Sequence, residues 1–221
     1  MTIPSASPRP DAHPRARVVL LAGPSGSGKS SLAARVGVPT VCLDDFYRDG
    51  DDPALPVGRL GIVDWDDPAS WDAERAVDAL VRLAHHGRAD LPIYDIPHNR
   101  AEGSHTIDLA GAPLVIAEGI FAAELVEHCR DEGILADALC LTHRPAVTFW
   151  RRLVRDLREG RKPPLTLLRR GWYLLRREPR IVARQIACGA VPVSSHDAAL
   201  RLRRLLADAG HTEAVVGEDA A

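Results

Sequence analysis

Cysteine is scarce in this chain, with four residues among 221, and no two of them have the C-x-x-C spacing of a zinc site. Cys42, Cys129, Cys140 and Cys188 stand in apolar stretches, so we expect buried free thiols rather than disulfides or metal ligands. No apolar run approaches the ~18 residues of a membrane span. The first 16 residues contain four prolines and several charges instead of the apolar core of a secretory signal. We therefore expect a disordered leader at 1–16 and a cytoplasmic protein.

Lysine is scarcer still, because Lys29 and Lys162 are the only two among 28 basic residues. An ammonium is a compact point charge, whereas the guanidinium of arginine is a wide planar fork. A lysine in so arginine-rich a chain therefore marks a place where the ammonium itself is needed. The rest of the composition, 46% hydrophobic and 26% charged, is that of an ordinary globular protein. We expect a single domain over 17–216 and a tail at 217–221.

Lys29 belongs to a glycine-rich stretch, Gly-Pro-Ser-Gly-Ser-Gly-Lys-Ser at 23–30, that matches the phosphate-binding pattern G-x-x-x-x-G-K-[ST] in full. A strand that leads through glycines into a helix N-terminus directs backbone N–H groups toward a phosphate. We predict a nucleoside triphosphate site in which Lys29 contacts the β- and γ-phosphates and Ser30 ligates Mg²⁺. The predicted nucleotide-binding residues of this loop are Gly23, Ser25, Gly26, Ser27, Gly28, Lys29, Ser30 and Ser31.

Strand-like and helix-like segments alternate along the chain, which predicts an α/β fold of the P-loop NTPase type with a doubly wound parallel sheet. The expected strands are 17–22, 40–43, 113–117 and 136–141. Asp67 and Pro68 resemble the start of a helix over 69–86. Two short strands, 91–94 and 106–109, are expected to form an inserted hairpin. Helical spacing recurs at about 146–157, 165–177, 181–188 and 198–209.

Three carboxylates are expected at the carboxyl ends of the parallel strands, where doubly wound sheets bind ligands. Asp44 and Asp45 follow the second strand, and Glu118 follows the central one. Phosphoryl transfer needs carboxylates that hold Mg²⁺ and that accept the proton of the attacking hydroxyl. Asp45 has an equally good alternative role as the cap of a turn, so Asp44 and Glu118 are the stronger candidates.

Six blocks between Val18 and Lys162 resemble, in the same order, the uridine kinase family of P-loop kinases, which includes phosphoribulokinase and pantothenate kinase relatives. The second block, Asp-Asp-Phe-Tyr at 44–47, is similar to D-x-[FY]-Y, and the third, at 64–72, to N-[FW]-D-x-P-x-[AS]-[FW]-D. The others are the glycine loop, 92–96 with His98 and Arg100, 116–120, and 151–156, which is similar to R-R-[IVL]-x-R-D. The resemblance implies ATP- and Mg²⁺-dependent phosphorylation of the 5′-hydroxyl of uridine or cytidine, as in pyrimidine salvage.

The resemblance also implies a role for each matching residue. Asp44 would be the general base, with Lys29 and Arg155 acting on the transferred phosphate. Ser30, Asp44 and Glu118 would form the metal shell. The acceptor site would comprise Asp44, Tyr47, Asp66, Tyr94, Ile96, His98 and Arg155, with Asp66 on the ribose hydroxyls. An arginine-rich helical lid at about 151–164 would bring Arg152, Arg155 and Arg161 to the phosphates.

The segment from Arg144 to Arg184 carries 13 basic and 3 acidic residues. Such a segment is typical of a nucleic-acid footprint, of a lid on phosphate oxygens, or of a solvated helix face. The lid suits the resemblance, so we expect a small-molecule acceptor and neither nucleic acid nor membrane as partner, and the chain is compatible with a homo-oligomer.

Two other functions stay open. One is the same chemistry on a non-nucleoside hydroxyl, because the loop at 94–100 is one residue shorter than the family's Y-D-[FY]-x-x-H-[ST]-R and has Ile96 in place of an aromatic residue. The other is a P-loop nucleotide-binding regulator without kinase activity.

Overall fold

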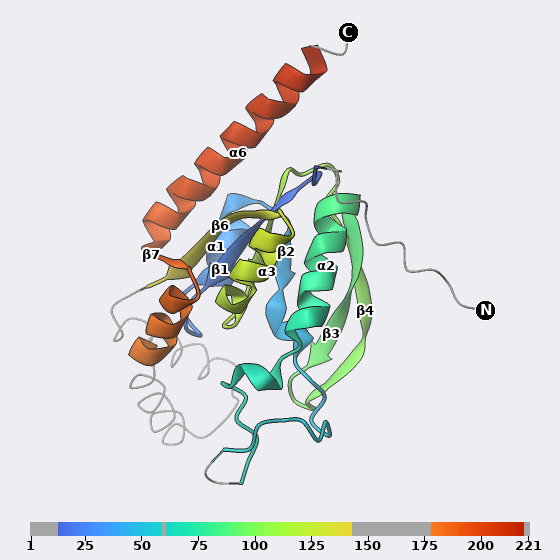
Figure 1. Cartoon of the computed structure of the whole chain (residues 1–221), viewed down its shortest axis with the longest axis vertical. Coiled ribbons are helices and arrows are strands. Elements are labelled where there is room, and N and C mark those ends of the chain that lie inside the picture. The colour runs from blue at the N-terminus through green and yellow to red at the C-terminus, as the bar shows by residue number, and fades with distance from the viewer. Residues whose placement is uncertain (1–12, 59–60, 143–177, 219–221) are drawn as a thin grey trace, which may run out of the picture.

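A parallel sheet of five strands in the order β2-β5-β1-β6-β7 forms the centre of the molecule (Figure 1). The computed structural model describes residues 13–58, 61–142 and 178–218, with side chains up to residue 209. The strands are β1 (Arg17–Ala22), β2 (Thr40–Cys42), β5 (Leu114–Glu118), β6 (Leu135–Leu141) and β7 (Val191–Val193). Every neighbouring pair in this sheet is parallel, which confirms the predicted fold class.

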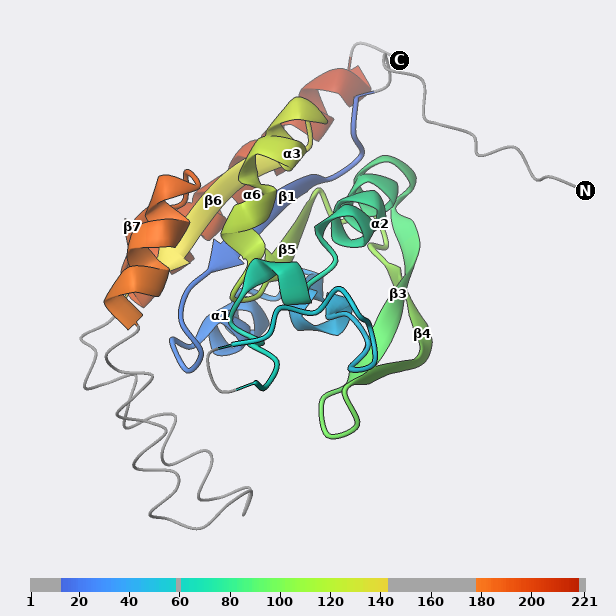
Figure 2. The ribbon, with the colours of Figure 1, turned by 60° about the horizontal axis from the view of Figure 1, so that its bottom comes forward.

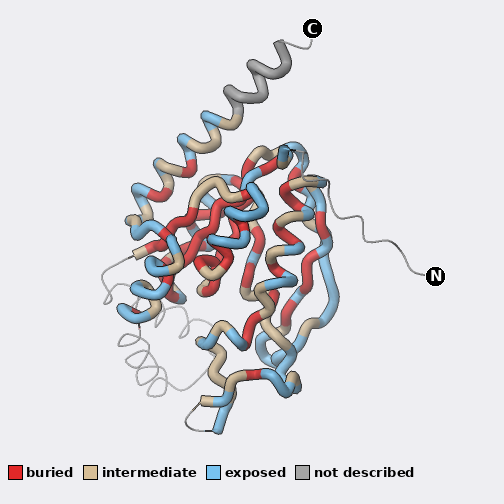
Figure 3. The backbone as a smooth tube through the Cα atoms, viewed as in Figure 1, coloured by how far each residue is buried: buried red, intermediate tan, exposed pale blue. Residues whose placement is uncertain are grey.

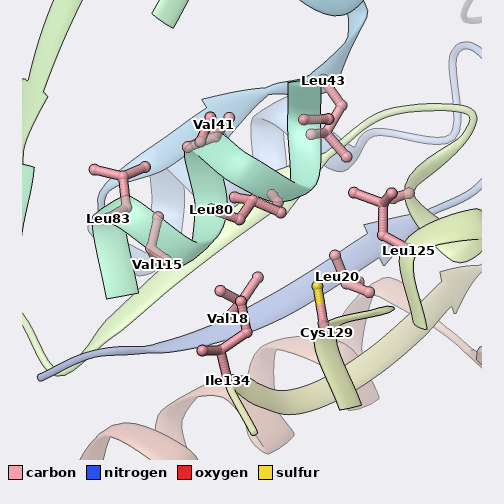
Figure 4. Close-up of a cluster of buried hydrophobic side chains, with 14 of the residues drawn as sticks. Val18, Leu20, Val41, Leu43, Leu80, Leu83, Val115, Leu125, Cys129 and Ile134 are labelled. Carbon is pink, nitrogen blue, oxygen red and sulfur yellow. The ribbon is translucent and has the colours of Figure 1, made fainter. Parts of the chain in front are cut away.

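Helices cover both faces of the sheet. Successive side chains of β1 point to opposite sides, and because they are all apolar from Val18 to Ala22, each face must be covered. Val18 and Leu20 pack on one face with Leu80 of α2 (Ala73–His86) and Cys129 of α3 (Val126–Asp131), as Figure 4 shows. Val19 and Leu21 pack on the other face, against α1 (Lys29–Val36) and α6 (Ser195–Glu218). In Figure 3 the buried residues of this core follow the strands, whereas exposed residues lie on the outer surfaces of the helices. None of the helices in the described residues is long and apolar enough to cross a membrane.

The predicted hairpin is present as a separate two-stranded antiparallel sheet beside α2 (Figure 1). Its strands, β3 (Arg88–Asp95) and β4 (Arg100–Asp108), are longer than the expected 91–94 and 106–109. Residues of β4 are exposed along almost its whole length, and they are mostly polar. A hydrophobic pattern could therefore not show how far β4 extends.

Two element boundaries differ from the sequence prediction, the start of the helix expected over 69–86 and the end of the second strand. Asp67 caps only a 3-10 turn, Pro68–Ser70, and its Oδ1 accepts the Ala69 N–H at 2.9 Å. Asp72 caps the actual helix, α2, by accepting the Arg75 N–H at 3.0 Å. The second strand ends at Cys42, because a 3-10 helix begins at Leu43.

Other differences lie toward the C-terminus. The strand β7 was not predicted, because it has three residues and contains Pro192, which is tolerated only at a sheet edge. The helix predicted at 198–209 is longer, Ser195–Glu218, and residues 178–187 are helical where 181–188 was expected. The helices expected at 146–157 and 165–177, and the lid, lie outside the described residues. The predicted domain limits stay predictions.

The four cysteines are all free thiols, but one differs from the prediction. Cys129 and Cys140 are buried, and Cys188 is half-buried, whereas Cys42 is exposed. Cys42 is the last residue of β2, which pairs with β5 alone among the strands that the structure describes. Its apolar neighbours in sequence, Val41 and Leu43, point into the core instead.

The start of the 3-10 helix Leu43–Phe46, labelled η1, is fixed by a buried indole. Nε1 of Trp71 donates a hydrogen bond to the Leu43 carbonyl at 2.7 Å, and Trp71 is only 3% exposed. We expect Trp71→Phe to lower the free energy of unfolding by about 1–3 kcal/mol, because the buried carbonyl loses its donor. Urea unfolding measures this, with Trp65→Phe at a half-buried indole as the matched control. Equal stability of the two variants would contradict the assignment.

Candidate active site

The glycine loop joins β1 to α1 in a backbone conformation that requires glycine. Gly26 and Gly28 have φ values of 80° and 90°, in the left-handed region. A Cβ atom on Gly23 would lie 2.9 Å from the Leu141 carbonyl oxygen. The loop is therefore packed closely against the end of β6 and leads directly into α1, whose first-turn N–H groups have no partner within the helix. Such a helix start is an anion site.

Lys29 lies at the centre of this arrangement with its side chain almost completely buried. Its Nζ donates to the carbonyl oxygens of Gly23 at 3.0 Å and Pro24 at 3.4 Å. Burial raises the pKa of Asp44, and the positive charge of Lys29 opposes that rise, so ammonium and carboxylate lie close enough to interact. The loop and the strand-end carboxylates therefore belong to one site.

Ser30 and Glu118 meet across the carboxyl edge of the sheet. The Ser30 hydroxyl donates to Oε1 of Glu118 at 2.5 Å. Glu118 is the last residue of β5 and is buried, and it lies opposite Cys42 of β2 in the strand register. Asp44, two residues beyond Cys42, is thereby brought to the same edge.

The electrostatics of Asp44 reflect this crowding. Burial raises the pKa of its carboxyl, and the nearby charges of Glu118 and Asp45 add to this, while Lys29 and a hydrogen bond from the Ile120 backbone N–H oppose it. Ser30, Asp44 and Glu118 together offer only oxygen atoms, which are the ligands that Mg²⁺ prefers. The residues present thus fit the metal that the sequence predicts.

Gly119 allows η1 to approach Glu118 this closely. A Cβ atom at position 119 would lie 2.9 Å from Cβ of Leu43 and 3.2 Å from Oδ1 of Asp44. Any larger residue would push the aspartate away from the end of β5. The glycine that follows Glu118 at the end of β5 therefore has a packing reason.

Tyr47 lies in a cluster of aromatic rings next to the carboxylates. Its ring centroid is 5.7 Å from that of Trp65, 5.8 Å from Tyr94 and 6.0 Å from Phe121. Burial raises the pKa of its hydroxyl, as do the charges of Asp44 and Asp66, so Tyr47 is within electrostatic reach of both. Asp44, Tyr47, Asp66 and Tyr94 are thus brought together. Sequence reasoning missed Trp65, although it adjoins Asp66, and it missed Phe121, which joins the cluster from a distant segment of the chain.

Asp45 has a structural role, although it is not the turn cap that the sequence suggested. Its Oδ1 accepts the backbone N–H of Tyr94 at 3.2 Å, which ties η1 to β3. The Tyr94 hydroxyl donates to the Arg48 carbonyl at 3.0 Å, and burial, with the charge of Asp49, raises its pKa to about 12. The hairpin is therefore fastened to the residues around Asp44.

Ile96 and His98 lie apart from this group, at the turn of the hairpin. Ile96 is 59% exposed, and the exposed His98 ring hydrogen-bonds the Asp95 carboxylate through Nδ1. Their predicted contact with an acceptor is not supported by burial and stays a prediction. Among the loop residues, Ser27 is buried, whereas Ser25 and Ser31 are exposed. Arg152, Arg155 and Arg161 lie outside the part of the chain that the structure describes.

Comparison with known proteins places this geometry in context. No family model matches the chain. A uridine kinase from Deinococcus deserti is 35% identical over 164 residues, which cover 68% of this chain and 74% of that protein. A uridine kinase from Schizosaccharomyces pombe is 32% identical over 143 residues, 59% of this chain, and the match spans only 31% of that longer protein.

The fold is shared with a solved structure from Silicibacter sp. TM1040, described as a candidate fructose transport system kinase. The TM-score is 0.55 over 82% of this chain and 88% of that one, with 21% identity. A likeness at this identity concerns the arrangement of the elements alone.

Proposed function

Because this chain belongs to the uridine kinase family, we propose that it transfers the γ-phosphate of ATP to the 5′-hydroxyl of uridine or cytidine in the presence of Mg²⁺. Phosphorylation of an alcohol is the chemistry of the family, and the nature of the alcohol is the proposed part. We expect the reaction to serve pyrimidine salvage in the cytoplasm.

The observation that supports the proposal best is the meeting of the glycine loop with two carboxylates from different strands. Ser30 reaches Glu118 at 2.5 Å, and Lys29 acts electrostatically on Asp44. A site that only held a nucleotide would need the loop, but it would not need a second carboxylate beside the lysine. A base next to the phosphate site is what transfer to a hydroxyl requires.

Each of these residues has a task in the proposed reaction. Asp44 takes the proton from the attacking hydroxyl, and the rise in its pKa makes it a better base than an exposed aspartate. Lys29 stabilises the negative charge on the transferred group. Ser30, Glu118 and Asp44 would hold Mg²⁺, which neutralises the phosphate oxygens when it is bound. Arg152, Arg155 and Arg161 keep their predicted place on the phosphates.

The acceptor would lie on the other side of Asp44, toward the aromatic cluster. Asp66 accepts hydrogen bonds only, which suits two neighbouring ribose hydroxyls. The rings around Tyr47 offer faces and edges on which a base can pack.

The test is an assay of ADP release by the full chain with ATP and Mg²⁺, in the presence of one acceptor at a time. ADP formation that depends on uridine or cytidine is expected, and the product should be the 5′-monophosphate. Absence of ADP formation with nucleosides, pantothenate, sugar phosphates and glycerate would contradict kinase activity and favour the regulator.

A second candidate is the same transfer to a non-nucleoside hydroxyl. The exposure of Ile96 and His98 favours it, because the hairpin turn then contributes little to a base-binding surface. In the same assay this candidate predicts turnover with a sugar phosphate or another polyol but not with uridine.

Asp66→Asn tests the acceptor side. We expect the KM for the nucleoside to rise roughly 10- to 100-fold, with the KM for ATP unchanged, because hydrogen bonds to a charged group are worth about 1.5–3 kcal/mol. Asp67→Asn is the matched control, since an asparagine Oδ1 can still accept the Ala69 N–H. Equal KM values for the two variants would exclude Asp66 from the acceptor site.

A further inference from the structure

A buried glutamine in the C-terminal part of the chain contacts the loop that follows β5, next to Glu118. Gln185 lies in the helical residues 178–187 and is 2% exposed. Its Nε2 donates to the Ile120 carbonyl at 2.7 Å, and its Oε1 accepts from the Cys140 thiol at 3.2 Å. Figure 2 shows this helix beside the end of β6, the strand that carries Cys140. Both ends of the amide are therefore satisfied.

The other side of Ile120 faces the proposed base. Its backbone N–H opposes the rise in the Asp44 pKa that burial causes, and a Cβ atom on the preceding Gly119 would lie 3.2 Å from Oδ1 of Asp44, so this loop passes directly beside the carboxylate. Ile120 also follows Glu118 by two residues, with Gly119 packed on Leu43 between them. The pair Gly119–Ile120 thus accepts the hydrogen bond from Gln185 on one side and lies against Asp44 on the other.

Burying an amide among apolar side chains is costly unless its hydrogen bonds are made. A leucine or methionine would fill the same volume without that requirement. A glutamine is needed here because the Ile120 carbonyl, in the loop after β5, is bonded by this amide. The glutamine at this position is therefore explained by its hydrogen bond to the loop after β5, and not by the packing of the helix.

The same helix has a second connection to this region, at the surface. Arg184 pairs with Glu124 at 2.9 Å, and the Cys188 thiol lies 3.6 Å from the same carboxylate. Glu124 belongs to the 3-10 helix Ala122–Leu125, beyond Ile120. The Arg184–Glu124 pair fastens the helix without touching Ile120, so it provides a natural control.

We propose that Gln185 is a positioning residue of the phosphoryl-transfer site, which holds Ile120 and so keeps the loop Gly119–Ile120 against the Asp44 carboxylate beside Glu118. The inference rests on the proposed kinase reaction. Gln185 touches neither substrate nor phosphate and acts through the loop. The orientation of the proposed base therefore depends on a residue 141 positions away in the sequence.

Gln185→Met keeps the length of the side chain and removes the donor. We expect kcat to fall about 10- to 100-fold, as for a small misplacement of a reacting group. The KM for ATP and the dissociation constant of ADP, measured by calorimetry without turnover, are expected to stay unchanged. Arg184→Met, which breaks only the surface ion pair, should keep kcat within about twofold of wild type. If Gln185→Met does not fold, Gln185→Leu, which also lacks the donor, is measured instead.

A double-mutant comparison separates positioning from a general structural effect. In an Asp44→Asn background, Gln185→Met should change the residual kcat very little, because the group that it positions is already gone. An unchanged kcat in the single variant, or an equal fall in both backgrounds, would overturn the inference. Failure of the proposed function itself is a different result, since the wild-type protein would then turn over no acceptor at all.

Discussion

Asp44→Asn is expected to reduce kcat by about 10²- to 10⁴-fold, the usual contribution of a general base. Asparagine keeps the size of the side chain and can still accept the Ile120 N–H, but it cannot take a proton. The nucleotide should still bind, because the glycine loop is untouched. Steady-state kinetics with a saturating acceptor and calorimetry with ADP measure the two effects separately.

The neighbouring carboxylate provides the control. Asp45→Asn changes the same functional group one residue away, where Oδ1 accepts the Tyr94 N–H at 3.2 Å. Asparagine can keep that bond, so we expect kcat within a few-fold of wild type. A variant at 44 that keeps its turnover, or equal losses at 44 and 45, would remove Asp44 from the chemistry and favour a nucleotide-binding regulator.

Asp44→Asn should also make the folded protein more stable. Burial raises the pKa of Asp44 above its ordinary value of 3.8, with Glu118 adding to the effect, so the folded state binds this proton more tightly than the unfolded chain. Above the raised pKa the ionised carboxylate therefore costs stability. Without metal or nucleotide, we expect a higher Tm for Asp44→Asn at neutral pH. The difference from wild type should shrink as the pH falls toward 3.8.

Local signals were enough to predict the centre of the fold. The first strand was predicted with its observed limits, Arg17–Ala22, because an uninterrupted apolar run next to a glycine loop has few alternatives. The boundaries failed where two residues of one type compete, as Asp67 and Asp72 do for the cap of α2. They failed also at β7, where three residues and a proline give no periodic signal.

The residues of the candidate site also fall into two groups, those that sequence reasoning selected and those that it missed. Lys29 was selected from the glycine-loop pattern, and Asp44 and Glu118 were selected because a parallel sheet brings its strand ends together. The structure brings the three side chains near one another, and their roles stay predictions. Gln185 and Phe121 were missed because their importance depends on contacts between segments far apart in sequence. Tyr47 was identified by resemblance alone, and only the structure shows it within electrostatic reach of Asp44 and Asp66.

The second large effect is expected at Lys29. Lys29→Met should lower kcat/KM by about 10²- to 10³-fold, the usual loss when one preorganised donor to transition-state charge is removed. Lys29→Arg should lose nearly as much. The Lys29 side chain is almost completely buried and its Nζ atom lies 3.0 Å from the Gly23 carbonyl, so we expect the wider planar guanidinium not to fit the same position. Arg35→Met, at the last turn of the same helix, is the matched control and should leave kcat/KM unchanged.

The pH dependence separates the charge of Lys29 from its shape. Lys29 lowers the pKa of Asp44, so its removal raises that pKa further. Since the base must be ionised to accept a proton, the acidic limb of the kcat profile should move to higher pH in Lys29→Met. It should stay in place in Lys29→Arg, which keeps a positive charge, although both variants are slow. An arginine variant as active as wild type would mean that the site needs only a cation, and the scarcity of lysine in this chain would then have no chemical reason.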